Sequence, residues 1–246
     1  MDQQHHELWI TELFNNYLAG VANAILSAAG LPVHDRPWDN FMTMQILVAV
    51  ILMLVAALVR MTLSVDRPGT IQQTFESIYD FLRGQTEEVI GHHGPKYLAF
   101  AGTMFLFILF GNLIGIIPGF ESPTMFVYVP CGCALATFVY YNLHGLREQG
   151  PLRYLAHFAG PVLWLAPLML PIEIISHLAR PLSLTVRLYA NMFAGEMVTL
   201  VFLGMVPLAV PAVFMGLHAF VALLQAYIFT VLTMIYIGGA VAHEEH

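Results

Sequence analysis

The sequence predicts an all-α polytopic membrane protein, with about five membrane-crossing helices and one amphipathic helix in the plane of the membrane. Hydrophobic residues make up 58% of its 246 residues and charged residues only 10%, whereas soluble domains average about 25% charged residues. Long apolar segments recur along the chain, and about 20 apolar residues are enough to cross a bilayer. We therefore expect a single membrane domain, 1–246, with the lipid bilayer as a partner and no nucleic acid.

The N-terminal segment, residues 1–40, has mixed polarity, and we expect it to lie outside the membrane. Trp9, Leu13, Tyr17 and Val21 recur within it at helical spacing. This pattern predicts a short amphipathic helix on the membrane surface.

Three segments have the length and apolarity of ordinary crossings: residues 41–60, 97–117 and 125–142. Ser122 or Thr124, in the loop before the third, can cap the helix that follows. We expect a polar connection from His144 to Gly160.

Residues 70–90 predict a helix that does not cross. Ile71, Phe75, Ile78 and Leu82 form a helical stripe, and charged residues occupy the opposite face. Such a helix is typical of a position in the membrane plane or packed on the surface.

The last two apolar segments, 161–202 and 212–241, are longer than one perpendicular crossing requires. The first contains Pro167, Pro171 and Pro181. Two interpretations are open: a re-entrant turn at the prolines, or one long, kinked helix that tilts to fit its length into the bilayer.

The loop cations predict the orientation. Only Arg36 precedes the first crossing, and the loops at 118–124 and 203–211 have no Lys or Arg. The other six all fall on one side of a five-crossing chain: Arg60, Arg67, Arg83, Lys96, Arg147 and Arg153. The positive-inside rule then places the N-terminus outside and the C-terminus in the cytoplasm.

The most unusual stretch is Leu170 to Leu200, which is apolar yet carries five ionisable side chains: Glu173, His177, Arg180, Arg187 and Glu196. Each costs roughly 2.5–3.5 kcal/mol at the centre of a membrane on insertion scales. Arg187 has no acid within eight residues on either side, and arginine cannot lose its proton in a protein. We therefore expect its anionic partner to be mobile or on another chain.

On a helix, Arg187 shares one face with small and polar residues: Glu173, Ser176, Arg180, Ser183, Ala190, Asn191 and Ala194. Small residues allow another helix to approach closely in a membrane. Glu196 lies nine positions on, about 180° around the helix, and so belongs to a different face.

The segment 212–241 supplies two matching polar groups, His218 and Gln225, seven residues apart on one face. If the two long helices pack antiparallel, Glu196 and His218 reach a similar depth and Gln225 approaches Arg187. A Glu and a His at matched depth can relay protons.

Glu173, Ser176 and His177 form a second polar cluster on the internal side. The sequence thus predicts two polar clusters at opposite depths, with a permanent cation between them.

Structural interpretations of these residues also remain open. Glu173 and His177 could form a pair four residues apart, and Arg180 could contact headgroups or Glu173. His218 and Gln225 could be interhelical hydrogen bonds, and Arg187 could have a partner within the chain.

Metal sites are not expected. Cys131 and Cys133 lie in an apolar run without neighbouring ligands and are typical of small buried residues. The adjacent His92 and His93 point apart on a helix and lack a third ligand, so a solvated loop is favoured.

Three stretches carry a resemblance to a known family. RPLSLTVRLYANMFAGEM (180–197) resembles the most characteristic motif of subunit a of F-type ATP synthases. GNLIGIIPGFESPT (111–124) and LLQAYIFTVLTMIYI (223–237) are similar to its two other recurring stretches. Tyr189 and Ala190 stand where the family often has Phe-Gly, and Ala preserves the close approach.

The resemblance implies that Arg187 is the stator arginine facing a ring of c subunits. It implies an external half-channel at Asn191, Glu196, His218 and Gln225. Glu173, Ser176 and Ser183 match positions attributed to the cytoplasmic half-channel, with Arg180 as an accessory residue. His177 is placed with this path through its neighbours rather than through the family. The resemblance also favours two long helices tilted along the ring.

The function that follows is proton translocation coupled to rotation and ATP synthesis. The chain would be a non-catalytic subunit without cofactor or metal, in a bacterial inner membrane, with the c-ring and the stator subunit b as partners. One alternative is an ion-coupled secondary transporter, which predicts inverted repeats and broken helices around a substrate cavity. A purely structural membrane scaffold is the other.

Overall fold

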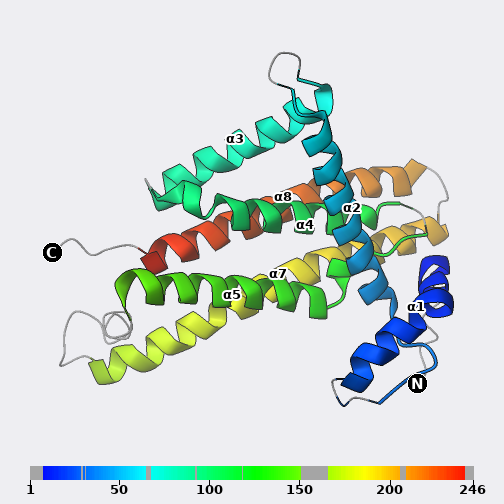
Figure 1. Ribbon diagram of the computed structural model, residues 1–246, viewed down its shortest axis with the longest axis horizontal. Coiled ribbons are helices and arrows are strands. Elements are labelled where there is room, and N and C mark those ends of the chain that lie inside the picture. The colour runs from blue at the N-terminus through cyan, green and yellow to red at the C-terminus, as the bar shows by residue number, and fades with distance from the viewer. Residues whose placement is uncertain are drawn as a thin grey trace.

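The computed structural model describes residues 8–28, 30, 32–64, 68–91, 93–117, 119–150, 166–205 and 209–241. All regular elements within these residues are helical (Figure 1), which confirms the predicted all-α class. The α-helices are α1 (Trp9–Ala28), α2 (Asn40–Thr62), α3 (Thr70–Ile90), α4 (Leu98–Ile114), α5 (Tyr128–Gln149), α7 (Ala166–Met205) and α8 (Ala209–Val241). Two short 3₁₀ helices are η1 (Gly94–Lys96) and η2 (Pro123–Met125).

The centre of the fold is formed by α4, α5, α7 and α8. In Figure 1, α4 lies beside α8 and α5 lies beside α7, and the two long helices also contact each other. Apolar side chains of α4, α7 and α8 share one core, which includes Phe105, Ile108, Leu188, Met192 and Phe229. This packing holds α7 and α8 side by side, while their packing as a tilted hairpin along a ring stays a prediction.

The long helix α7 runs without interruption through Pro171 and Pro181. The re-entrant turn at these prolines is therefore wrong, and one long helix is confirmed. Proline removes one backbone hydrogen bond and costs about 3 kcal/mol in a helix interior, but neighbouring side chains can re-satisfy backbone groups in membrane helices. Pro181 leaves the carbonyl of His177 without its usual helical donor, and four residues later the Thr185 hydroxyl donates to the Pro181 carbonyl at 2.8 Å. Residues 161–165 of the expected crossing lie outside the described residues.

The helix α5 continues past its expected end at residue 142. The polar connection expected from His144 was therefore wrong for its first six residues, which are helical to Gln149. Gly150 ends the helix with φ 78° and donates its N–H to the Leu146 carbonyl. Glycine adopts a positive φ without the steric cost that other residues pay, so it commonly follows the end of a helix. Residues 151–160 of that connection lie outside the described residues.

The expected capping by Ser122 or Thr124 is also wrong. Neither side chain caps the helix that follows. Ser122 Oγ instead donates to the Gly111 carbonyl at 2.8 Å, and Thr124 Oγ1 donates to Asn112 Oδ1 at 2.5 Å. These bonds tie η2 back onto α4.

The predicted helix at the N-terminus is present as α1. Trp9, Leu13, Tyr17 and Val21 are all exposed, while residues on the opposite face, such as Asn15 and Ala22, are buried. The stripe is thus available to a lipid surface, and its location on the membrane stays a prediction.

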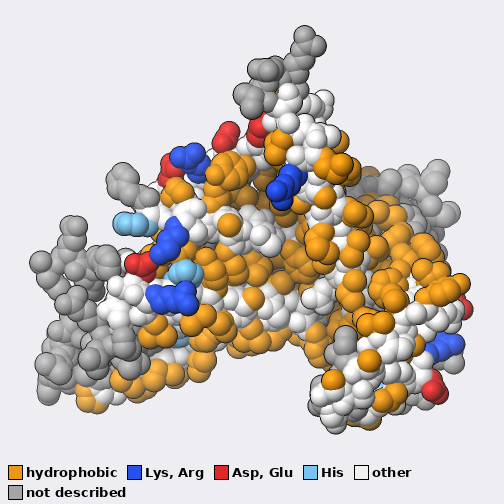
Figure 2. Space-filling model, viewed as in Figure 1, with side chains coloured by type: hydrophobic (Ala, Val, Ile, Leu, Met, Phe, Trp, Pro, Cys, Tyr) orange, Lys and Arg blue, Asp and Glu red, His pale blue; other side chains and the backbone are white. Residues whose placement is uncertain are grey.

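Two described helical segments are long and apolar enough to cross a membrane, Asn40–Thr62 and Val213–Val241. The apolar helix α4 is shorter, with 17 residues. Hydrophobic side chains dominate the face shown in Figure 2, and the charged groups gather over α3 with the adjoining ends of α4 and α5, and around α1. The fold is thus that of a membrane protein, while the number of five crossings stays a prediction.

Candidate functional site

Arg187 lies on a face of α7 that the described residues of the chain leave open. The adjoining side of the helix, with Leu184, Leu188 and Met192, is buried in the core. The small and polar residues that share the face of Arg187 are exposed: Ser176, Ser183, Ala190, Asn191 and Ala194. Arg187 itself is half-buried. An open, small-residue face beside a membrane cation can receive a second helix at close range.

No anion within the described part of the chain neutralises Arg187. The ion pairs there join other residues, and Arg187 forms neither an ion pair nor a hydrogen bond with any described residue. An interhelical partner inside the chain, one of the structural interpretations, thus finds no support in this part of the molecule. A guanidinium at membrane depth needs an anionic or polar partner, so the open face is where that partner can bind.

A polar cluster lies between α7 and α8, on the C-terminal side of Arg187. Asn191 Nδ2 donates to Gln225 Oε1 at 2.8 Å. One turn farther along α7, Gly195 lies against His218: a methyl group on Gly195 would be 2.8 Å from His218 Nδ1. Glu196 is the residue after Gly195. Glu196 and His218 therefore lie at the same level along the two helices, as predicted. Gln225 contacts Asn191, one turn beyond Arg187.

Three buried polar atoms of this cluster have no hydrogen-bond partner among the described residues. They are Glu196 Oε2, His218 Nε2 and Gln225 Nε2. Buried polar groups are almost always hydrogen-bonded, and exceptions point to a bound water, an ion or a functional role. Three exceptions in one cluster mark it as the place within the described residues where bound water or a functional role is to be sought.

The internal cluster is arranged differently from the prediction. Arg180 lies 3.9 Å from the Glu173 carboxylate and 5.3 Å from the ring centroid of Tyr236, so the structural interpretation of Arg180 as a partner of Glu173 is supported. His177 is buried on another face, with Nε2 2.9 Å from Asn142 Oδ1. The structure therefore brings Glu173 and Arg180 together but turns His177 toward α5.

One acidic residue near the external cluster was missed by the sequence analysis. Glu121, in the loop before η2, is half-buried and accepts a hydrogen bond from Asn40 Nδ2 at 3.3 Å, and η2 contacts α7, the helix that carries Glu196. Glu121 and Glu196 are 75 positions apart in sequence. The only available signal was the position of Glu121 in a loop expected on the external side.

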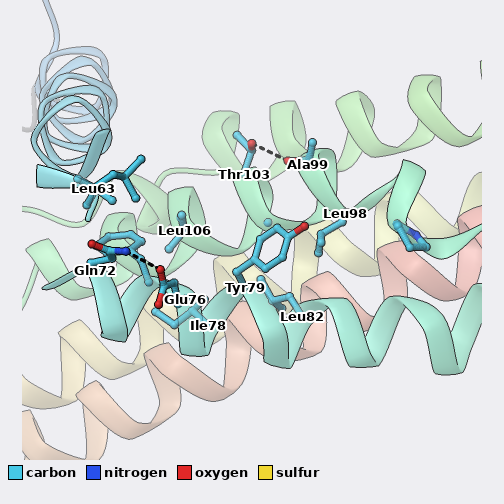
Figure 3. Close-up of a pocket in the computed structure, with 14 residues that line it drawn as sticks. Leu63, Gln72, Glu76, Ile78, Tyr79, Leu82, Leu98, Ala99, Thr103 and Leu106 are labelled. Carbon is cyan, nitrogen blue, oxygen red and sulfur yellow. Dashed lines mark hydrogen bonds between the residues drawn. The ribbon is translucent and has the colours of Figure 1, made fainter. Parts of the chain in front are cut away.

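A cavity of about 590 Å³ lies between α2, α3 and α4 (Figure 3). Its lining is mainly apolar, with Gln72 donating to Glu76 at 2.7 Å as the main polar feature. No residue of α7 or α8 contributes to it. A transporter would place its substrate cavity at the polar groups and break its helices there, whereas α7 is continuous beside Arg187.

Metal ligands do not gather within the described residues, where no group of three or more His, Cys, Asp or Glu side chains could hold an ion. Cys131 and Cys133 are free thiols, and Cys133 is buried. His92 lies outside the described residues.

Comparisons with known proteins agree on one family. The ATP synthase A chain family matches residues 41–238. A protein of Solibacter usitatus named ATP synthase subunit a is 61% identical over 232 residues, which cover 94% of this chain and 100% of the relative. Proteins of the same name from Koribacter versatilis and Helicobacter pylori are 52% and 47% identical, covering 97% and 72% of this chain and 98% and 79% of the relatives. The chain therefore belongs to the ATP synthase A chain family.

Proposed function

We propose that this chain conducts protons through two offset half-channels to and from the carboxylates of a c-ring, and so couples the proton-motive force to rotation and ATP synthesis. As a member of its family, the chain is a membrane-embedded subunit of an ATP synthase and is not itself catalytic. The c-ring and the stator subunit b are its proposed direct partners, with the cell inner membrane of a bacterium as its location.

The external half-channel is the cluster between α7 and α8. A proton arriving from outside binds Glu196 or His218, whose buried atoms Oε2 and Nε2 have no partner in the described part of the chain. It then passes along the helix pair to Asn191 and Gln225. From there it neutralises a carboxylate on a c subunit at the open face of α7.

The internal half-channel lies at the other end of the same open face, with Glu173, Ser176 and Ser183 as its polar residues and Arg180 bound to Glu173. His177 lies at its wall, where it joins α7 to α5. After one turn of the ring, the c-subunit proton leaves by this path to the cytoplasm.

Arg187 separates the two paths. A permanent cation repels protons, so it prevents direct passage from one half-channel to the other. The ionised c-subunit carboxylate is attracted to the guanidinium as it passes, which lowers the free energy of an otherwise exposed anion in the membrane. Protons then cross only when they are carried around the ring.

The single observation that carries this proposal is the half-buried Arg187, which no described residue neutralises, on an open, small-residue face. The proposed geometry has the N-terminus outside, crossings near 41–60, 97–117 and 125–142, and long tilted helices at 161–202 and 212–241. Helix α3, near 70–90, lies in the membrane plane.

The test is ATP synthesis in membrane vesicles under an imposed proton-motive force. Arg187→Ala and Arg187→Lys should both abolish synthesis while the enzyme still assembles, because Lys keeps the charge but not the planar geometry of the guanidinium. Arg83→Ala is the matched control, since Arg83 is exposed on α3 and pairs with Glu87. Synthesis near the wild-type rate in Arg187→Ala would refute the mechanism.

A further inference from the structure

The loop between α4 and α5 is held against the external half-channel by a chain of hydrogen bonds. Asn112 of α4 donates to the Ala222 carbonyl of α8 at 3.3 Å, one turn after His218. Thr124 donates to the same Asn112 side chain, and η2 also contacts α7. The residues just before η2 are therefore positioned beside the polar cluster of α7 and α8.

Glu121 is the ionisable side chain of this loop, and it is half-buried. Asn40, the first residue of α2, donates from Nδ2 to Glu121 Oε2 at 3.3 Å. The other end of the Asn40 amide, Oδ1, accepts the backbone N–H of Leu8 at 3.2 Å. Asn40 is buried, so it holds the carboxylate in place from the N-terminal side of the chain.

Glu121 and Glu196 lie on segments that meet in the fold. Glu121 directly precedes Ser122, the N-cap residue of η2, and η2 packs against α7, the helix that carries Glu196. Glu196 keeps one buried oxygen without a partner in the described residues, so it has an atom ready to receive a proton.

We propose that Glu121 is the outer proton-transfer residue of the external half-channel, which collects a proton from outside and passes it to Glu196. This inference rests on the proposed function and adds a residue to it. The proton leaves a hydronium ion for the Glu121 carboxylate, and the new O–H bond breaks when the proton moves to Glu196 Oε2. Glu121 returns to the carboxylate form, so no other reactant is consumed.

Asn40 is the positioning residue of this step. Asn40 does not transfer a proton itself, but its side-chain amide fixes the position of the Glu121 carboxylate. Replacing it should weaken transfer through Glu121 without removing any ionisable group.

The experiment measures passive proton flux through vesicles that contain the membrane sector without its catalytic sector, driven by a potassium-diffusion potential. Glu121→Gln should lower the flux about tenfold or more, a modest value for losing a proton-transfer group. Glu121→Asp should restore much of it, because the acid is retained. Glu12→Gln is the matched control, since Glu12 is an exposed acid of α1.

Double variants distinguish a loss of proton transfer from a loss of correct structure. Glu121→Gln should add no further loss in a Glu196→Gln background, because two residues in one path are not additive. Asn40→Ala should lower the flux when Glu121 is present and have no effect beside Glu121→Gln. Assembly is checked by the amount of ring subunit that copurifies with each variant.

The outcomes distinguish this inference from the proposed function. Flux lost in Glu196→Gln but retained in Glu121→Gln would overturn the role of Glu121 alone. Flux retained in Glu196→Gln would overturn the external half-channel itself. A Glu121→Asp variant that assembles normally but conducts no better than Glu121→Gln would also count against proton transfer through Glu121.

Discussion

Gly195 is the position where the structure makes the sharpest prediction about the external half-channel. A methyl group there would lie 2.8 Å from His218 Nδ1 and 3.2 Å from Cε1, against 3.4–4 Å for an ordinary contact. Gly195→Ala must therefore displace the imidazole by about half an ångström, at a cost of about 1–3 kcal/mol for overpacking. A 1 Å misplacement of a reacting group can lower a rate about 100-fold, so we expect a roughly tenfold loss of proton flux.

The assay is passive proton flux per assembled membrane sector, with ATP-driven pumping as a second measurement. Gly84→Ala on α3 is the control, because no atom lies within 4 Å of a methyl group there and Ala has the higher helix propensity. The double variant Gly195→Ala, His218→Ala should recover packing but not flux. Wild-type flux in an assembled Gly195→Ala enzyme would refute the placement of His218 against α7.

Three further predictions concern other contacts. Asn191→Leu should reduce flux and destabilise the chain by about 0.6–2 kcal/mol, because the buried Gln225 loses its hydrogen-bond donor. Asn191→Gln keeps an amide N–H that can donate to Gln225 Oε1 and should lose less stability, and thermal melts of the assembled enzyme measure the difference. His177→Leu should lower the free energy of unfolding by about 1–3 kcal/mol, because the side chain at position 177 can no longer bond to Asn142. His177→Gln should largely preserve proton flux. A complete block of flux in His177→Gln would instead assign the imidazole to proton transfer. Burial, then the charges of Lys96 and Arg147, lower the pKa of His144 from 6.5. The contribution of neutral His144 to the free energy of unfolding is therefore fully present above pH 6.5, and it is lost as the pH falls toward the lowered pKa of the folded state. Lys96→Gln should raise that pKa in an NMR titration of labelled histidine; an unchanged or lower value would contradict the assigned cause.

The sequence was sufficient for the helical class and for the face that carries Arg187. Apolar length identified most helices, and the spacing of charged and small residues identified the open face of α7. Both signals are local, because a helix places residues three, four and seven apart on one side.

Contacts between distant segments could not be predicted in the same way. The pairing of Asn191 with Gln225 needs the register of two helices, which side-chain packing decides. The positions of His177 and Glu121 depend on α5 and on the loop before η2. Ser122 was expected to cap a helix because of its residue type, but a nearby carbonyl of α4 is its actual partner.

The central claim is that the anion for Arg187 lies on another, moving polypeptide. Disulfide cross-linking in the assembled enzyme tests it most directly, with single cysteines at Ser183 and Ala190 on the open face and at Leu182, which is 65% exposed on another side of α7. Paired cysteines are placed on the small ring subunits beside their membrane carboxylate. Our account predicts cross-links from positions 183 and 190 and none from position 182. Equal yields from all three positions, or cross-links from position 182 alone, would contradict it.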